Sequence, residues 1–223
     1  MRLYLVRHGQ STANVHRALD SLPPGPPLTE LGEQQARDLA QRLATEPVIA
    51  VYASVATRAR QTAEPVAEKH GLELRVIEGV HEVFVGELEG RDDVDAHTRF
   101  GEVYRRWADG EWHARMPGGE SAHDLLDRFL PALQGITRQH ENADEGSDEL
   151  SRDQQLDQQK HRAVVLISHG AAIRLVGMRL AANVDAAHWW STPLPNTGQV
   201  LLRRDVTEKT GWHCLQWTGM KLT

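Results

Sequence analysis

The chain has 223 residues, a net charge of −6 and a single cysteine, Cys214. Its length suits one large α/β domain with a buried core, and we expect a single domain over residues 1–223. The acidic balance argues against a protein that coats nucleic acid, and one cysteine excludes an internal disulfide framework. No apolar stretch approaches the roughly 20 residues that span a bilayer. We therefore expect a cytoplasmic protein without nucleic-acid or membrane partners.

Five apolar, β-branched segments predict strands along the chain. They cover residues 3–6, 48–53, 72–77, 163–168 and 200–202. Segments with a helical pattern lie between or near the first four strands, an alternation typical of a largely parallel sheet covered on both faces. We therefore predict a three-layer α/β fold with a mostly parallel central sheet and helices on both faces. We expect Cys214 to be a small buried filler in a C-terminal strand.

Helical patterns follow the predicted strands in order. The first helix opens after Thr29, which suits an N-cap, and ends near Pro47. Two further helices cover about residues 58–70 and 121–140, and a fourth begins directly after His169. Each carries an apolar stripe that we expect to face the core.

Residues 142–160 interrupt this pattern with an acidic run rich in Gln, Asp, Glu and Ser. Such a composition is typical of chain that does not join a packed core. We expect a mobile surface insertion between a helix and a strand. A lid or an acidic docking arm is the functional alternative.

Several charged residues and histidines stand where predicted strands end. The pair Arg7-His8 closes the first strand before a glycine, Arg58 follows the second, Glu82 follows the third, and His169 follows the fourth. The carboxyl ends of parallel strands lie on one edge of a sheet. We therefore expect these five residues to converge on one site although they are far apart in sequence.

Two histidines, two arginines and one carboxyl group suit phosphoryl transfer. Neutral imidazole is a competent nucleophile for phosphorus, and arginines neutralise the nonbridging oxygens while they disfavour imidazolium at His8. Glu82 is assigned as the general acid for the leaving group and then as the base for water. Because the arginines supply positive charge and the 12 histidines show no helical zinc spacing, we expect no metal and no cofactor.

Taken together, the motifs resemble the histidine phosphatase superfamily, also called phosphoglycerate mutase-like. The matching motifs are spread over nearly the whole chain and include Arg7-His8-Gly9-Gln10-Ser11, Pro27-Leu28-Thr29, Arg58-Ala59, Glu82, Pro117-Gly118-Gly119-Glu120-Ser121 and Ser168-His169-Gly170. The resemblance implies that His8 is the phosphorylated nucleophile and Glu82 the proton donor. It also implies that three residues hold the phosphoryl group, namely Arg7, Arg58 and His169.

Five further residues are candidates for binding phosphate or substrate. Asn14 matches a family position near the phosphate pocket, and Gly170 follows the second histidine. Gln10 and Ser11 either donate to phosphate or shape the turn. Arg115 looks like the arginine with which the phosphatase branch contacts a second anionic group of the substrate.

Two activities of the family, hydrolysis and mutase transfer, are distinguished by how the substrate is held. Arg105 and Arg106 could mimic the paired arginines of mutases, but the proline-rich continuation of mutases is absent. A solvated helix face is the alternative interpretation of these two arginines.

We predict a phosphomonoester hydrolase that acts on a small phosphorylated metabolite through a phosphohistidine intermediate. The alternatives are a cofactor-dependent phosphoglycerate mutase and a non-catalytic binding or regulatory module. A homodimer is the default oligomer.

Overall fold

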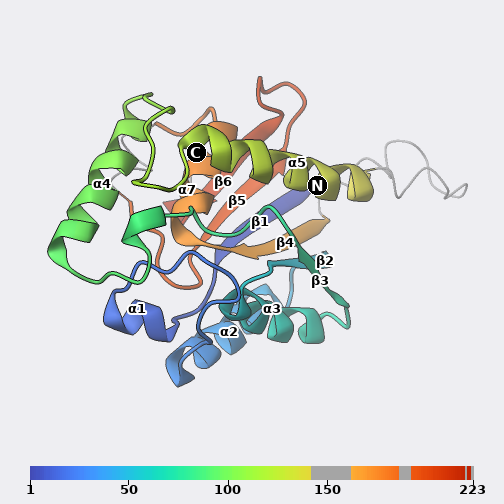
Figure 1. Ribbon diagram of the computed structural model, residues 1–223. Coiled ribbons are helices and arrows are strands. Elements are labelled where there is room, and N and C mark those ends of the chain that lie inside the picture. Colours follow the sequence, from blue (N-terminus) through green and yellow to red (C-terminus); the bar gives the residue numbers. More distant parts are fainter. Residues whose placement is uncertain (142–161, 186–191, 219, 222–223) are drawn as a thin grey trace, which may run out of the picture.

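The computed structural model describes residues 1–141, 162–185, 192–218 and 220–221. Within them, one seven-stranded sheet has the order β3-β2-β4-β1-β5-β6-β7 (Figure 1). The strands are β1 (Arg2–Arg7), β2 (Val48–Ser54), β3 (Leu74–Ile77), β4 (Ala163–Ser168), β5 (Gln199–Arg204), β6 (Trp212–Trp217) and β7 (Met220–Lys221). The first four are mutually parallel, whereas β5, β6 and β7 pair antiparallel with their neighbours. The mostly parallel sheet is confirmed, and an antiparallel edge extends it.

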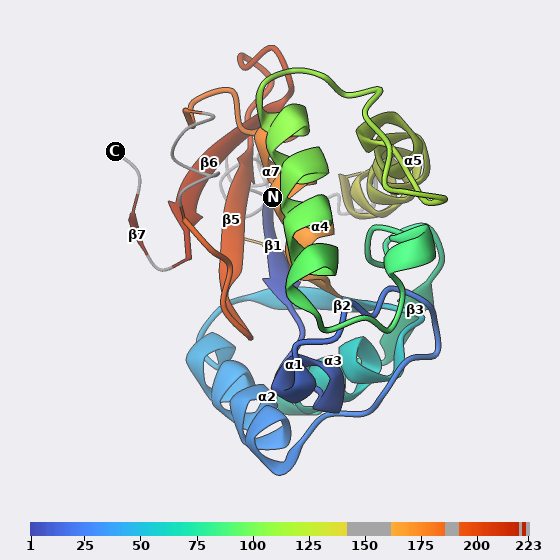
Figure 2. The ribbon, with the colours of Figure 1, turned by 60° about the vertical axis from the view of Figure 1, so that its left-hand side comes forward.

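Helices cover both faces of the sheet, as predicted. They are α1 (Thr12–His16), α2 (Glu30–Leu43), α3 (Thr57–Lys69), the 3-10 helix η1 (Gly86–Leu88), α4 (Val94–Ala108), α5 (Ala122–Glu141) and α7 (Gly170–Leu180). Figures 1 and 2 show α2 and α3 on one side and α4, α5 and α7 on the other. Side chains of β1 alternate between these layers: Leu3 and Leu5 join one core cluster, and Tyr4 and Val6 join the other.

Most predicted elements are present, but the sequence pattern predicts neither α1 nor α4. The Thr29 side chain accepts a hydrogen bond from the Gly32 amide and caps α2, and Cys214 is buried in β6. On α4, Arg105 and Arg106 lie on an exposed face and pair with nearby acids. The solvated helix face is therefore the correct alternative for these two arginines.

Two expectations are not settled by the described residues. The insertion at residues 142–160 lies outside them, and the single-domain organisation stays a prediction. In the described part of the chain, no helix combines the length and the apolar character needed to cross a membrane.

The turn after β1 is held between α2 and α3, and this fixes the position of His8. A Cβ on Gly9 would lie 2.6 Å from the Gly32 carbonyl oxygen, so both backbones need glycine to pass this closely. The Gly9 amide donates to the Thr62 hydroxyl of α3 at 2.9 Å, and the Thr29 amide donates to the Gln10 carbonyl at 2.9 Å. The backbone on either side of the histidine is thereby tied to both helices.

Candidate active site

A cavity of about 380 Å³ lies beside the carboxyl ends of β1 and β2. Seven of the ten predicted site residues line it: Arg7, His8, Gln10, Ser11, Asn14, Arg58 and Glu82. The completely buried His169 lies behind this lining, with its ring centroid 5.2 Å from that of His8. The structure therefore brings together the five residues, which come from four separate segments of the chain.

His8 is held as a neutral imidazole with a defined tautomer. It is 4% exposed, and its Nδ1 lies 2.7 Å from the Gly9 carbonyl oxygen. A carbonyl oxygen only accepts, so Nδ1 carries the proton, and Nε2 keeps its lone pair. Burial lowers the pKa of His8 well below its usual value, and the charges of Arg58 and Arg7 lower it further. The nitrogen that faces Arg58 is thus unprotonated, as a nucleophile requires.

Arg58 is the central cation of the site. It is 2% exposed, and its Nε donates to His8 Nε2 at 3.1 Å. Its Nη2 lies 3.3 Å from His169 Nδ1 and donates to the Asp20 carbonyl at 3.0 Å, while its Nη1 lies 2.6 Å from Asp20 Oδ2. The guanidinium therefore joins both histidines to the loop that carries Asp20.

His169 is oriented from both sides of its ring. A guanidinium only donates, so His169 Nδ1 accepts the hydrogen bond from Arg58. The proton of the neutral ring is therefore on His169 Nε2, which donates to the Ser54 hydroxyl at 2.9 Å. Burial first, and the nearby Arg58 second, lower the pKa of His169 well below the usual value. Both site histidines are therefore neutral in this state.

Arg7 and Glu82 complete the predicted set. Arg7 Nη1 donates to the Leu194 carbonyl at 2.7 Å, and its buried Nε has no hydrogen-bond partner among the described residues. The carboxylate of Glu82 accepts the amides of Ala171 at 3.1 Å and Ala172 at 2.9 Å in the first turn of α7. A carboxylate at a helix N-terminus receives both hydrogen bonds and the favourable end of the helix dipole.

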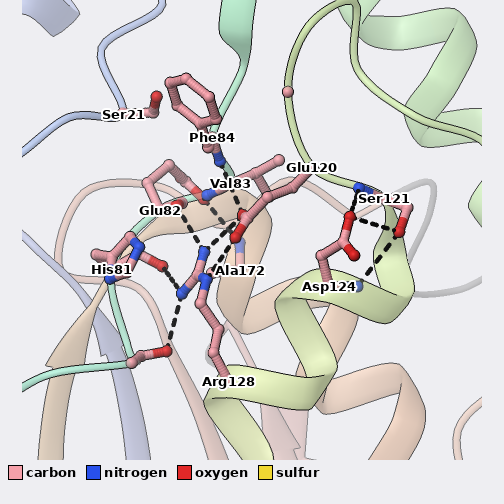
Figure 3. Close-up of polar contacts among 12 residues, drawn as sticks. Ser21, His81, Glu82, Val83, Phe84, Glu120, Ser121, Asp124, Arg128 and Ala172 are labelled. Carbon is pink, nitrogen blue, oxygen red and sulfur yellow. Dashed lines mark hydrogen bonds and ion pairs between the residues drawn. The ribbon is translucent and has the colours of Figure 1, made fainter.

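The backbone that carries Glu82 is held by Arg128 of α5 (Figure 3). Arg128 donates to the carbonyls of Gly79, His81 and Glu82 at 2.8–2.9 Å. Glu120 pairs with Arg128 at 2.7 Å and also accepts the Phe84 amide at 3.0 Å. This ion pair sets the course of the chain through Glu82 without itself lining the cavity.

The turn residues mainly bond to one another. Asn14 Oδ1 accepts from the Ser11 amide at 3.2 Å and from Asn196 Nδ2 at 3.1 Å, and the same Nδ2 lies 3.1 Å from the His8 carbonyl. Gln10 Oε1 accepts from the Thr29 hydroxyl. Ser11 therefore shapes the turn, and contacts of Gln10, Ser11 and Asn14 with phosphate stay predictions.

Two other predicted binding residues lie away from the cavity lining. Gly170 begins α7, and a Cβ there would lie 3.2 Å from Arg7 Nε, so its lack of a side chain makes room for that arginine. Arg115 donates to the Gly119 carbonyl at 2.9 Å and pairs with Asp124 at 2.5 Å on a surface-exposed face. The structure does not bring Arg115 to the cavity, so its predicted substrate contact has no geometric support.

Four residues of the site network were missed from sequence. Ser54 ends β2, so the strand-end rule that found the histidines could have found it. Asp20, Arg128 and Asn196 lie in loops or within a helix, where nothing in the local sequence marks them. Their roles depend on contacts with distant segments.

The two neutral histidines make stability depend on pH. Their folded pKa values lie below the unfolded value of 6.5, so below that pH the unfolded chain binds protons that the folded chain does not. We expect the free energy of unfolding to fall by about 1.4 kcal/mol per pH unit for each histidine as the pH drops from about 6.5. Urea unfolding between about pH 7 and about pH 5.5 measures this slope.

A His8→Gln variant removes one of the two titrating groups and should show a shallower slope than the wild type. Equal slopes for the two proteins would contradict a neutral, buried His8. Replacement of the exposed His16 by Gln serves as the control and should leave the slope unchanged.

Comparison with known proteins places this geometry in a family. The model of the histidine phosphatase superfamily (branch 1) matches residues 3–145. A probable phosphoglycerate mutase GpmB of Photorhabdus laumondii is 38% identical over 135 residues, which cover 60% of this chain and 62% of that protein. The chain thus spans less than two thirds of the length of this relative.

Solved structures agree over almost the full length. One described as mycobacterial hydrolase 1 is 26% identical with a TM-score of 0.76, and 99% of each chain is covered. A mycobacterial glucosyl-3-phosphoglycerate phosphatase in complex with inorganic phosphate is 26% identical with a TM-score of 0.71, covering 97% of this chain and 96% of that chain. The chain belongs to the histidine phosphatase superfamily, branch 1.

Proposed function

We propose that the protein is a metal-independent phosphomonoester hydrolase that acts on a small phosphorylated metabolite through a phosphohistidine intermediate. The observation that carries the proposal is the unprotonated Nε2 of His8, which borders the cavity and lies 3.1 Å from the Arg58 guanidinium. Phosphatases among the similar solved structures support the same reaction class.

The first step is attack of His8 Nε2 on the phosphorus of the ester. The nitrogen–phosphorus bond forms as the bond from phosphorus to the leaving oxygen breaks, and the proton on Nδ1 stays hydrogen-bonded to the Gly9 carbonyl. Before this attack, as the ester binds, Arg58 turns its Nε from the ring nitrogen to a phosphoryl oxygen, which frees the Nε2 lone pair. Arg7 Nε, buried without an acceptor among the described residues, is the second donor for these oxygens.

Glu82 donates a proton in the first step and accepts one in the second. Its carboxyl group protonates the leaving alkoxide, and the resulting carboxylate later takes a proton from the attacking water as the nitrogen–phosphorus bond breaks. In the structure the side chain accepts three backbone amides, from Val83, Ala171 and Ala172. These hydrogen bonds fix the position of the Glu82 side chain for both steps.

A hydrolase is favoured over a mutase by the cations around the cavity. A mutase must grip the carboxylate of its substrate, but Arg105 and Arg106 are paired with Asp109 and Glu111 on the exposed face of α4. The described cavity wall also includes the apolar side chains of Leu19, Val85 and Phe100. Arg17 and His97 also line the cavity, so a mutase is tested directly below.

The test is an assay of purified protein with phosphomonoesters at acidic to neutral pH, with and without a metal chelator. We expect release of inorganic phosphate that the chelator does not reduce. Conversion of 3-phosphoglycerate to 2-phosphoglycerate, stimulated by 2,3-bisphosphoglycerate, would establish the mutase instead. No turnover of any ester in a panel of phosphorylated metabolites would support the non-catalytic module.

Replacement of Glu82 by Gln should affect esters according to their leaving group. An alkyl phosphate needs a proton on its leaving oxygen, whereas nitrophenolate leaves without one. We expect kcat/KM to fall by about 10²-fold or more for glycerol phosphate and much less for nitrophenyl phosphate. This ratio reports phosphorylation alone, because kcat/KM excludes steps after the first irreversible one. Equal losses for both esters would remove Glu82 from the acid role, and the exposed Glu87→Gln variant is the control.

A further inference from the structure

A carboxylate that the phosphatase reaction does not use lies in the cavity. Asp20 lines it, and its Oδ2 is 2.6 Å from Arg58 Nη1. The same guanidinium donates through Nε to the nucleophilic nitrogen of His8. The Arg58 guanidinium therefore contacts both Asp20 and the His8 nitrogen that attacks phosphorus. A phosphoryl group held by Arg58 has to share this cation with Asp20.

The backbone of Asp20 is tied down on both sides. The Leu19 amide donates to the Arg91 carbonyl at 2.8 Å, and the Gly90 amide donates to the Leu19 carbonyl at 2.7 Å. On the other side, the Ser21 amide donates to Glu89 Oε1 at 2.8 Å. The loop thus holds the carboxyl group of Asp20 in the cavity, next to Arg58.

The charges that face Asp20 are of both signs. Burial raises the pKa of its carboxyl group above the usual value, Arg58 opposes this shift, and the carboxylates of Glu89 and Glu82 add to it. The remaining charged or titratable groups that line the cavity are Arg7, Arg17, His8 and His97. An arriving oxyanion adds further negative charge and so favours the protonated form of Asp20.

We infer that Asp20 is a phosphoryl-binding residue that acts as a carboxylic acid, so that binding of a tetrahedral oxyanion against Arg58 takes up one proton. The proton lies between Asp20 and an oxygen of the anion. It turns a repulsion between two anions into a charge-assisted hydrogen bond. The inference rests on the proposed function only in taking the cavity as the oxyanion site, and it does not require turnover.

Sulfate is the probe, because it is a tetrahedral dianion that does not itself titrate near neutral pH. Calorimetric titration in buffers of different ionisation enthalpy gives the number of protons taken up on binding. We expect the wild type to take up about one proton more than Asp20→Asn when sulfate binds. Above the pKa of Asp20, each pH unit should therefore raise the Kd of the wild type for sulfate by a factor about tenfold larger than the factor for Asp20→Asn. At the upper end of the pH range, Asp20→Asn should bind sulfate more tightly than the wild type.

Asp38→Asn is the matched control, since it removes the same charge from the exposed face of α2 and should behave as the wild type does. Equal proton uptake by the wild type and Asp20→Asn would overturn the inference, as would absence of sulfate binding by both. Should Asp20→Asn fail to fold, infrared difference spectra of Glu82→Gln decide, because this variant lacks the other carboxyl group of the described cavity lining. A carboxylic-acid band that appears with sulfate supports the inference, and its absence overturns it.

The two proposals fail separately. Proton-linked sulfate binding in a protein that hydrolyses no ester would reject the hydrolase and leave the role of Asp20 standing. Hydrolysis that depends on His8, together with proton-independent sulfate binding, would reject the role of Asp20 alone.

Discussion

Replacement of His8 by Ala should lower kcat for a phosphomonoester by about 10⁴-fold or more, because it removes the atom that forms the bond to phosphorus. The residual rate would come from Arg7 and Arg58, which still bind and polarise the phosphoryl group. Steady-state assays with nitrophenyl phosphate measure the loss. Nitrophenolate needs no proton, so its release isolates the nucleophile from the acid.

A second measurement addresses the intermediate itself. Wild-type protein quenched in alkali during turnover of a labelled ester should retain phosphate on histidine, and His8→Ala should retain none. The exposed His16→Ala variant is the control for loss of a histidine outside the cavity. Undiminished turnover by His8→Ala, or equal labelling of both proteins, would reject the assigned nucleophile.

Replacement of Arg58 by Lys should have the second largest effect, a loss of about 10³-fold in kcat. Lysine keeps the charge, but one ammonium group cannot reproduce the planar fork that meets His8, His169 and both the carboxylate and the carbonyl of Asp20. Transition-state charge on the phosphoryl oxygens would lose a bidentate donor, and the nucleophile would lose its orienting partner.

The experiment compares kcat and KM for Arg58→Lys with those for Arg60→Lys, an exposed arginine on the same helix. Thermal denaturation establishes that both variants fold. A folded Arg58→Lys with wild-type kcat and wild-type KM would mean that Arg58 serves the structure and not the reaction. A rise in KM with unchanged kcat would limit its part to substrate binding.

The predicted part of the site follows from one regularity of parallel sheets. His8 follows β1, Arg58 lies shortly after β2 and His169 follows β4, and parallel strands present these carboxyl ends on one edge. Continuous apolar, β-branched segments predicted the strands, and glycines follow His8 and His169 at two of their ends. The capping residue Thr29 and the start of α7 were equally visible, because both depend on neighbouring residues alone.

Helix α4 was missed for a physical reason. Its buried residues, Ala96, Val103, Tyr104 and Trp107, are separated by charged residues that cover the exposed face. The pattern becomes meaningful only against the layer on which it packs, where Tyr104 donates to the Ala171 carbonyl of α7 at 2.8 Å.

The sequence by itself determined the parallel strands, most of their covering helices and the grouping of Arg7, His8, Arg58, Glu82 and His169, because these depend on local patterns and on segments that follow strands. Only the tertiary structure decided which atom does what. The tautomers of the histidines and the position of the Glu82 side chain depend on hydrogen bonds from separate segments. Asp20 pairs with Arg58, and Arg128 donates a hydrogen bond to the Glu82 carbonyl. Both contacts join residues far apart in the chain, so no local pattern predicts them.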